Sequence, residues 1–137
     1  LRQVSKNALL LNPMSTEIIC KTDAKYLNSG LVVIDCSWKK GTDIFKKRLP
    51  GTNKRLPILQ AGNPTNYSKL FTLSSSEALA ASLFITGRQE ESELVLSKFK
   101  WGHTFFELNS GILDDYCKAN TSDEIAIIEK QYYEKFL

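Results

Sequence analysis

The run of four apolar residues at positions 31–34, Leu-Val-Val-Ile, constrains the fold of this chain more than any other feature. An unbroken apolar run of this length, rich in β-branched residues, is typical of a central parallel strand that is buried on both faces. Parallel strands need helical crossovers, and the second half of the chain shows the helical spacing of apolar residues. We therefore predict an α/β domain with a mainly parallel sheet flanked by helices.

The length of 137 residues fits one domain, which we expect to span residues 1–137. Hydrophobic residues make up 42% of the chain and charged residues 24%, a balance that allows a packed core. No apolar run approaches the roughly 20 residues that a membrane span requires. A soluble globular protein is the expectation.

Cysteine and histidine are scarce. The chain has three cysteines, none in a CxxC pair, and one histidine, His103. A structural zinc site needs about four such ligands at short spacings, so no metal site is expected. The same scarcity argues against a disulfide framework and favours a reducing, intracellular compartment.

Further elements follow from local signals. Residues 8–11 and 17–20 are expected to be extended, and residues 22–28 to form one or two helical turns, with Thr22 or Asp23 as N-cap and Gly30 beyond the end. Ser74 and Glu77 form a capping box that begins a helix over residues 75–85, stopped by Gly87. The remaining predictions are loops over 39–55 and 60–70, helices over 88–99, 103–108 and 111–118, and a final helix to Phe136 capped by Ser122.

Charge is unevenly distributed along the chain, although its net value is only +3. Positive side chains crowd the segment 39–55, where Asp43 is the only acid. Such a loop either follows a phosphate backbone or is simply solvated, and the nearby Trp38 and Tyr67 favour RNA, because aromatic stacking joined to basic charge is the usual grip on single strands. The candidate RNA contacts are Lys39, Lys40, Lys46, Lys47, Arg48, Lys54 and Arg55.

Asp35 stands where the apolar run ends, and ligands of parallel sheets bind outside the carboxyl ends of the strands. From there a carboxylate can hold ribose hydroxyls or take a proton, or it can simply cap the next turn. Trp38 either stacks on a ligand or packs in the core. No GxGxxG or GxxxxGK[ST] motif is present, so nucleoside triphosphate chemistry has no support.

Four segments taken together resemble one family. They are GLVVIDCSW at 30–38, LPILQAGNPTNY at 56–67, LSSSEALAA at 73–81 and FKWGHTFFELN at 99–109. They occur in the order found in the ribosome-biogenesis aminocarboxypropyltransferases of small-subunit (18S-type) rRNA, and the similarity runs from about Leu9 to the C-terminal helix.

The resemblance implies a fold like that of the SPOUT RNA methyltransferases, with a C-terminal trefoil knot. It implies an enzyme that takes S-adenosylmethionine as cosubstrate, without a metal, and transfers its 3-amino-3-carboxypropyl group to N3 of an (N1-methyl)pseudouridine. Which of the three carbons of a sulfonium reacts is decided by orientation. The partner would be rRNA in a pre-ribosomal particle, and the enzyme a monomer in the cytoplasm, with the nucleus as a second expectation.

By match to the family motifs, Asp35 would be the catalytic base or hold the ribose. The cosubstrate would be bordered by Val33, Asp35, Trp38, Leu56, Leu59, Phe71, Leu73 and Ser75, the last at the start of a helix that presents free N–H groups. Two alternatives stay open: a non-catalytic RNA-binding assembly factor, and an RNA methyltransferase of the same superfold.

The chain departs from the family pattern in two places. Ser68 follows the Asn-Tyr pair, where the family usually has glycine. The family also begins with a basic N-terminal segment that helps to hold the cosubstrate, and this chain is expected to lack part of it.

Overall fold

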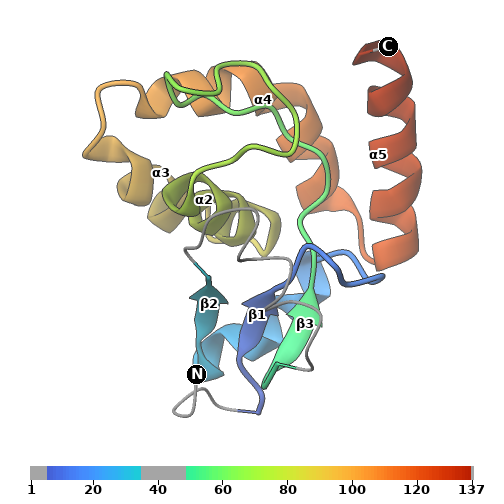
Figure 1. Cartoon of the computed structure of the whole chain (residues 1–137). Coiled ribbons are helices and arrows are strands. Elements are labelled where there is room, and N and C mark those ends of the chain that lie inside the picture. Colours follow the sequence, from blue (N-terminus) through green and yellow to red (C-terminus); the bar gives the residue numbers. More distant parts are fainter. Residues whose placement is uncertain (1–5, 35–48, 137) are drawn as a thin grey trace.

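The computed structural model describes residues 6–34 and 49–136. They form a parallel sheet of three strands, in the order β2-β1-β3, with helices packed against it (Figure 1). The predicted α/β class is confirmed. The strands are β1 (Leu9–Leu11), β2 (Leu31–Val33) and β3 (Thr52–Lys54); the helical elements are η1 (Lys21–Ser29), α2 (Ser75–Ile85), α3 (Gln89–Ser97), α4 (Gly102–Lys118) and α5 (Ser122–Phe136).

The central strand of the described sheet is β1, and not β2 as the sequence predicted. Leu9 and Leu10 are completely buried between the two neighbouring strands, whereas all three residues of β2 are half-buried. The prediction was wrong because two strands of similar apolarity compete for the central position, and their composition does not rank them.

The strand β3 lies in a segment predicted to be a loop. Its residues, Thr-Asn-Lys, carry no apolar signal, yet Thr52 N–H donates to Ala8 O at 2.7 Å and Asn12 N–H donates to Lys54 O at 2.8 Å. The Asn12 side chain also donates to Asn53 Oδ1 at 2.9 Å. Backbone pairing to β1 therefore makes this polar segment a strand.

Most helices agree with their sequence signals. The capping box of Ser74 and Glu77 begins α2 as predicted, and Gly87, at φ +94°, follows its end. The turn before β2 is a 3₁₀ helix that ends at Gly30, but it begins after Cys20, whose N–H donates to the Asp23 carboxylate at 2.9 Å. Asp23, the third residue of this helix, is therefore not its N-cap, and its carboxylate binds the backbone N–H of the N-cap residue Cys20.

The C-terminal half differs from the prediction at two positions. One helix, α4, runs through Gly111 where two short helices were expected. The side chain that caps α5 belongs to Thr121, because its hydroxyl accepts from Glu124 N–H at 3.1 Å. The Ser122 hydroxyl accepts instead from Ile18 N–H at 2.8 Å.

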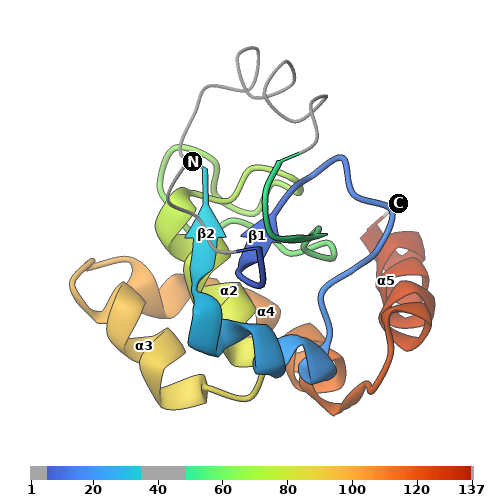
Figure 2. The same cartoon turned by 90° about the horizontal axis from the view of Figure 1, so that it is seen from below.

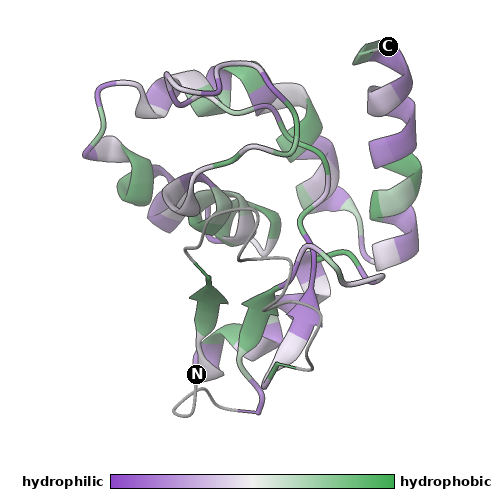
Figure 3. Ribbon diagram, viewed as in Figure 1, coloured by the Kyte–Doolittle hydropathy of each residue, from purple (hydrophilic) through white to green (hydrophobic). Residues whose placement is uncertain are grey.

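The core lies between the sheet and the helices α2 and α4. Leu9 from the sheet, Ile85 from α2 and Phe105, Leu113 and Tyr116 from α4 are completely buried in it. Seen from below, α5 stands apart from α2 and α3, beyond α4 (Figure 2). Coloured by hydropathy, β1 and β2 are apolar while α5 is mixed (Figure 3). Among the described residues no helix is both long and apolar enough to span a membrane.

Candidate functional site

The carboxyl ends of the three strands meet at one edge of the sheet. Leu11 pairs with Val33 on one side and with Lys54 on the other, so the segments that follow these residues leave the sheet together. In Figure 1, β2 points toward α2, and the two elements are in contact. Val33 and Leu56, two of the predicted site residues, therefore lie at or just beyond this edge, where ligands of parallel sheets bind.

After β3 the chain continues as an extended segment, residues 55–62, which we call the anchored segment. Side chains of two helices satisfy its backbone at residue 58: Ile58 N–H donates to the Glu129 carboxylate at 2.9 Å, and Ile58 O accepts from the Tyr116 hydroxyl at 2.9 Å. At Gln60, two residues further along the segment, the Asn109 side chain accepts from the backbone N–H and donates to the backbone O, both at 2.8 Å. These side chains form the hydrogen bonds to the backbone that a neighbouring strand would otherwise provide.

The far end of the anchored segment is held by Glu77, a completely buried carboxylate. It accepts from Gly62 N–H at 2.7 Å, from the Asn63 side chain at 2.6 Å and from Ser74 N–H at 3.0 Å. A Cβ at Gly62 would lie 2.5 Å from Phe105 N, so only glycine fits there. The capping box could be read from the sequence, but nothing in it revealed that the same glutamate would hold a distant loop.

The Asn63 side chain satisfies polar groups of its own loop and of α2. Its side-chain oxygen accepts from Asn66 N–H at 3.0 Å, while its amide donates to Glu77. The following turn, residues 63–71, folds back on the anchored segment: Ser68 N–H donates to Ala61 O at 2.7 Å and Ala61 N–H to Lys69 O at 2.9 Å.

The return of this turn brings two predicted site residues opposite each other. Gln60 forms an antiparallel bridge with Leu70, which places Leu59 and Phe71 as neighbours across it. Leu59 is buried, whereas Phe71 is 66% exposed and has a left-handed backbone at φ +62°. Leu56 and Leu73 are half-buried and pack against the core, and Ser75 follows as the first residue of α2.

Apart from Ser75, these residues are apolar, and Leu73 lies two residues before the first residue of α2. Apolar surface of this kind suits a flat heteroaromatic group, and the first N–H groups of α2 suit a carboxylate. That these residues together border the cosubstrate stays a prediction.

Lys54 and Arg55, two of the predicted RNA contacts, are engaged with acids of this chain. Arg55 forms a two-pronged pair with Glu129, both N–O distances being 2.8 Å, and this hydrogen bonding raises the pKa of the guanidinium. Lys54 contacts Glu17, and Asp23 at 3.8 Å. Burial lowers the pKa of Lys54, but the two carboxylates outweigh it and the net change is a rise. An rRNA contact would compete with these pairs, and it stays a prediction.

The other predicted site residues lie outside the described residues, so their roles stay predictions. They are Asp35, Trp38, Lys39, Lys40, Lys46, Lys47 and Arg48.

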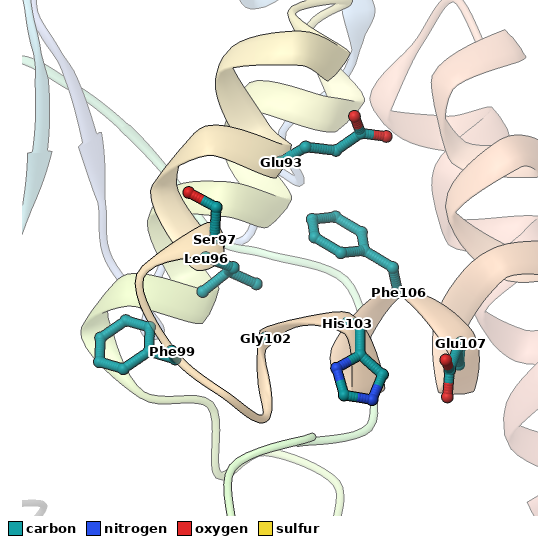
Figure 4. Close-up of a pocket in the computed structure, with 8 residues that line it drawn as sticks. All are labelled: Glu93, Leu96, Ser97, Phe99, Gly102, His103, Phe106 and Glu107. Carbon is teal, nitrogen blue, oxygen red and sulfur yellow. The ribbon is translucent and has the colours of Figure 1, made fainter.

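A separate pocket of about 480 Å³ lies between the end of α3 and the start of α4 (Figure 4). Leu96, Phe99 and Phe106 line it together with Glu93 and polar neighbours, and no predicted cosubstrate or RNA residue does. His103 also lines this pocket. Within the described ranges there is no group of three or more His, Cys, Asp or Glu that could hold a metal ion.

Comparison with known proteins shows one consistent relationship. The family described as "Ribosome biogenesis protein, C-terminal" matches residues 9–133. A "16S rRNA aminocarboxypropyltransferase" of Methanosarcina acetivorans is 40% identical over 132 residues, which are 95% of this chain and 75% of the relative. An "18S rRNA aminocarboxypropyltransferase" of Schizosaccharomyces pombe is 37% identical over 129 residues, 93% of this chain and 45% of the relative.

A solved structure agrees with the fold. It is that of the SAM-dependent rRNA:acp-transferase Tsr3 from Vulcanisaeta distributa, which matches with a TM-score of 0.84 and 35% identity over 93% of this chain and 71% of that protein. The resemblance noted in the four sequence segments is thus confirmed over almost the whole chain. With this identity and coverage, the chain belongs to the family of rRNA aminocarboxypropyltransferases.

Proposed function

We propose that this chain transfers the 3-amino-3-carboxypropyl group of S-adenosylmethionine to N3 of an (N1-methyl)pseudouridine in small-subunit rRNA, within a pre-ribosomal particle. Like the relatives named above, it is an S-adenosylmethionine-dependent rRNA aminocarboxypropyltransferase. The observation that carries the proposal is the 40% identity to a 16S rRNA aminocarboxypropyltransferase over 95% of the chain. The choice of pseudouridine N3 rests on the resemblance of the sequence motifs.

The cosubstrate is assigned to the carboxyl edge of the sheet. Leu59 and Phe71, neighbours across the Gln60–Leu70 bridge, supply apolar surface for the adenine, and Val33, Leu56 and Leu73 border it. The start of α2 at Ser75 is assigned to the carboxylate of the amino acid, because the first N–H groups of a helix attract anions. Asp35 and Trp38 complete the site in the proposal.

The reaction forms a bond between pseudouridine N3 and the γ-carbon of the cosubstrate and breaks the bond from that carbon to sulfur. The positive sulfonium leaves as a neutral thioether, 5′-methylthioadenosine, and N3 loses its proton. We assign Asp35 to accept this proton. The alternative is that Asp35 only holds the ribose and solvent takes the proton.

The proposal also covers the chain topology, the oligomeric state and the cellular compartment of the protein. The resemblance supports a SPOUT-like arrangement with a C-terminal trefoil knot, a monomer, and a place in the cytoplasm, with the nucleus second. The side chains of α2, α4 and α5 that hold the anchored segment are consistent with a site built where distant parts of the chain meet.

The test is a calorimetric titration with S-adenosylmethionine, followed by reaction with pre-rRNA. We expect binding that weakens in Trp38→Ala, a product carrying the labelled carboxypropyl group, and methylthioadenosine as by-product. S-adenosylhomocysteine as by-product would identify a methyltransferase instead. RNA binding without any binding of S-adenosylmethionine would identify a non-catalytic assembly factor.

Asp35→Asn separates the two roles of the carboxylate. Loss of transfer with unchanged cosubstrate affinity is expected of a base. Equal loss of both would assign Asp35 to binding alone.

A further inference from the structure

The turn at residues 63–71 presents an exposed aromatic ring and an exposed lysine next to the proposed site. Tyr67 is 55% exposed. Lys69, two residues on, is exposed and takes part in none of the ion pairs found among the described residues, in contrast to Lys54 and Arg55. Ring and charge together are the elements that grip single-stranded nucleic acid.

The backbone that carries these side chains is fixed on both sides of Tyr67. Asn66 N–H donates to the Asn63 side chain at 3.0 Å, and Ser68 N–H donates to Ala61 O at 2.7 Å. Lys69 N–H donates to Asn66 O at 2.9 Å, and Lys69 O accepts from Ala61 N–H at the same distance. Because the turn is held in place, little conformational entropy is lost when a ligand settles on it.

The turn itself rests on the buried Glu77, which binds Gly62 and Asn63. It also continues directly into Phe71, which lies beside Leu59 in the proposed cosubstrate wall. In Figure 1 the green segment rises along α4, and the chain that follows the turn descends to the start of α2. A base stacked on the turn would therefore stand next to the cosubstrate.

We propose that Tyr67 stacks on an unpaired base of the small-subunit rRNA and that Lys69 pairs with a phosphate beside it. The inference rests on the proposed function, since it names residues that hold the substrate of that same reaction. Bases in a loop or bulge expose the π-face that such a ring requires, whereas a paired stem does not. Single-stranded rRNA is thus the ligand, and the contact is sequence-tolerant.

The test measures the affinity of the full chain for a single-stranded fragment of small-subunit rRNA by fluorescence anisotropy. Tyr67→Ala and Tyr67→Leu are expected to weaken binding about 5- to 150-fold, because one base-stacking contact is lost. Tyr67→Trp is expected to retain it. Lys69→Gln is expected to reduce the slope of log affinity against log salt by about 0.7, the value for one phosphate contact on a single strand.

Matched controls lie on α5, where Tyr133 and Lys130 are exposed. Tyr133→Ala and Lys130→Gln should leave both affinity and salt slope as in the unmodified chain. S-adenosylmethionine affinity should be unchanged in Tyr67→Ala, and this result would show that the turn has kept its fold. The same affinity should fall in Phe71→Ala.

Unchanged RNA affinity in Tyr67→Ala would overturn the inference, and so would a parallel loss of S-adenosylmethionine affinity in that variant. These outcomes are distinct from failure of the proposed function. An unmodified chain that makes no carboxypropyl product would refute the function, whereas a Tyr67-dependent affinity for RNA would still support the contact.

Discussion

Ser68 adopts a left-handed backbone, with φ of +63°, in the middle of the turn that carries Tyr67. Side chains with a Cβ are strained there by about 1–2 kcal/mol, which glycine avoids. The resemblance led us to expect glycine at this position, and a left-handed backbone is the conformation that glycine adopts without strain. The serine that departs from the family pattern therefore leaves a strained backbone at position 68.

We expect Ser68→Gly to stabilise the chain by about 0.5–1 kcal/mol, because relief of strain exceeds the entropy that glycine adds to the unfolded state. Urea denaturation measures the free energy of unfolding. Ser29→Gly is the matched control: Ser29 is exposed and has no positive φ, so this variant should lose stability. Equal effects of the two substitutions would show that Ser68 is unstrained.

Glu77 accepts three hydrogen bonds without contact with solvent. In Glu77→Gln one oxygen becomes an NH₂ group that faces other donors, so we expect a loss of about 1–3 kcal/mol in unfolding free energy. Glu90→Gln, at an exposed position of α3, should change little. Urea denaturation of both variants tests this, and an equally stable Glu77→Gln would mean that the turn has other support.

At the scale of elements, the sequence predicted those features that depend on residues close together in the chain. The capping box of α2 and the glycines that end η1 and α2 act within a few residues of chain, and all three are where the sequence predicted. The polar strand β3 and the central place of β1 depend on pairing between residues over 40 positions apart, such as Leu9 with Thr52. No local pattern records such pairing.

In the candidate site, too, contacts between distant residues could not be predicted from the sequence. The proposed location of the site at the carboxyl ends of strands rests on topology, and the proposed cosubstrate residues rest on the family motifs. The side chains that hold the anchored segment were not predicted, because Asn109, Tyr116 and Glu129 read as ordinary residues of amphipathic helices. Only the folded chain shows that each meets a backbone group of residues 58–60.

Tyr116 of α4 gives this arrangement a pH dependence. Burial raises the pKa of its hydroxyl above the usual value of 10.0, while the hydroxyl donates to Ile58 O. The unfolded chain therefore loses this proton at lower pH than the folded chain. The resulting stabilisation is fully present below pH 10 and declines as pH rises above it, by about 1.4 kcal/mol per pH unit.

Tyr116→Phe is therefore expected to lose about 1–3 kcal/mol at pH 8, since Ile58 O loses its donor, and to show a shallower decline of stability above pH 10. Urea denaturation at pH 8, 10 and 11 measures both effects. Tyr133→Phe, at an exposed position of α5, should keep the decline of the unmodified chain. A decline in Tyr116→Phe as steep as in the unmodified chain would assign the alkaline loss to other groups.

At the scale of the whole molecule, the proposed cosubstrate site joins parts that are far apart in the chain. Val33 ends β2, Leu56 and Leu59 belong to the anchored segment, and Ser75 begins α2. Three helices hold that segment, so a ligand bound there stabilises the sheet, the turn and the helices together. Binding to the folded state alone raises the free energy of unfolding by mass action.

We expect S-adenosylmethionine at 100 times its dissociation constant to stabilise the chain by about 2.7 kcal/mol, and to raise the melting temperature by roughly 10 °C. Calorimetry of thermal unfolding measures this rise. Phe71→Ala should reduce the rise, because the adenine loses one side of its apolar wall, whereas Tyr67→Ala should not. A rise that disappears in Tyr67→Ala would place that ring against the cosubstrate and withdraw it from the RNA.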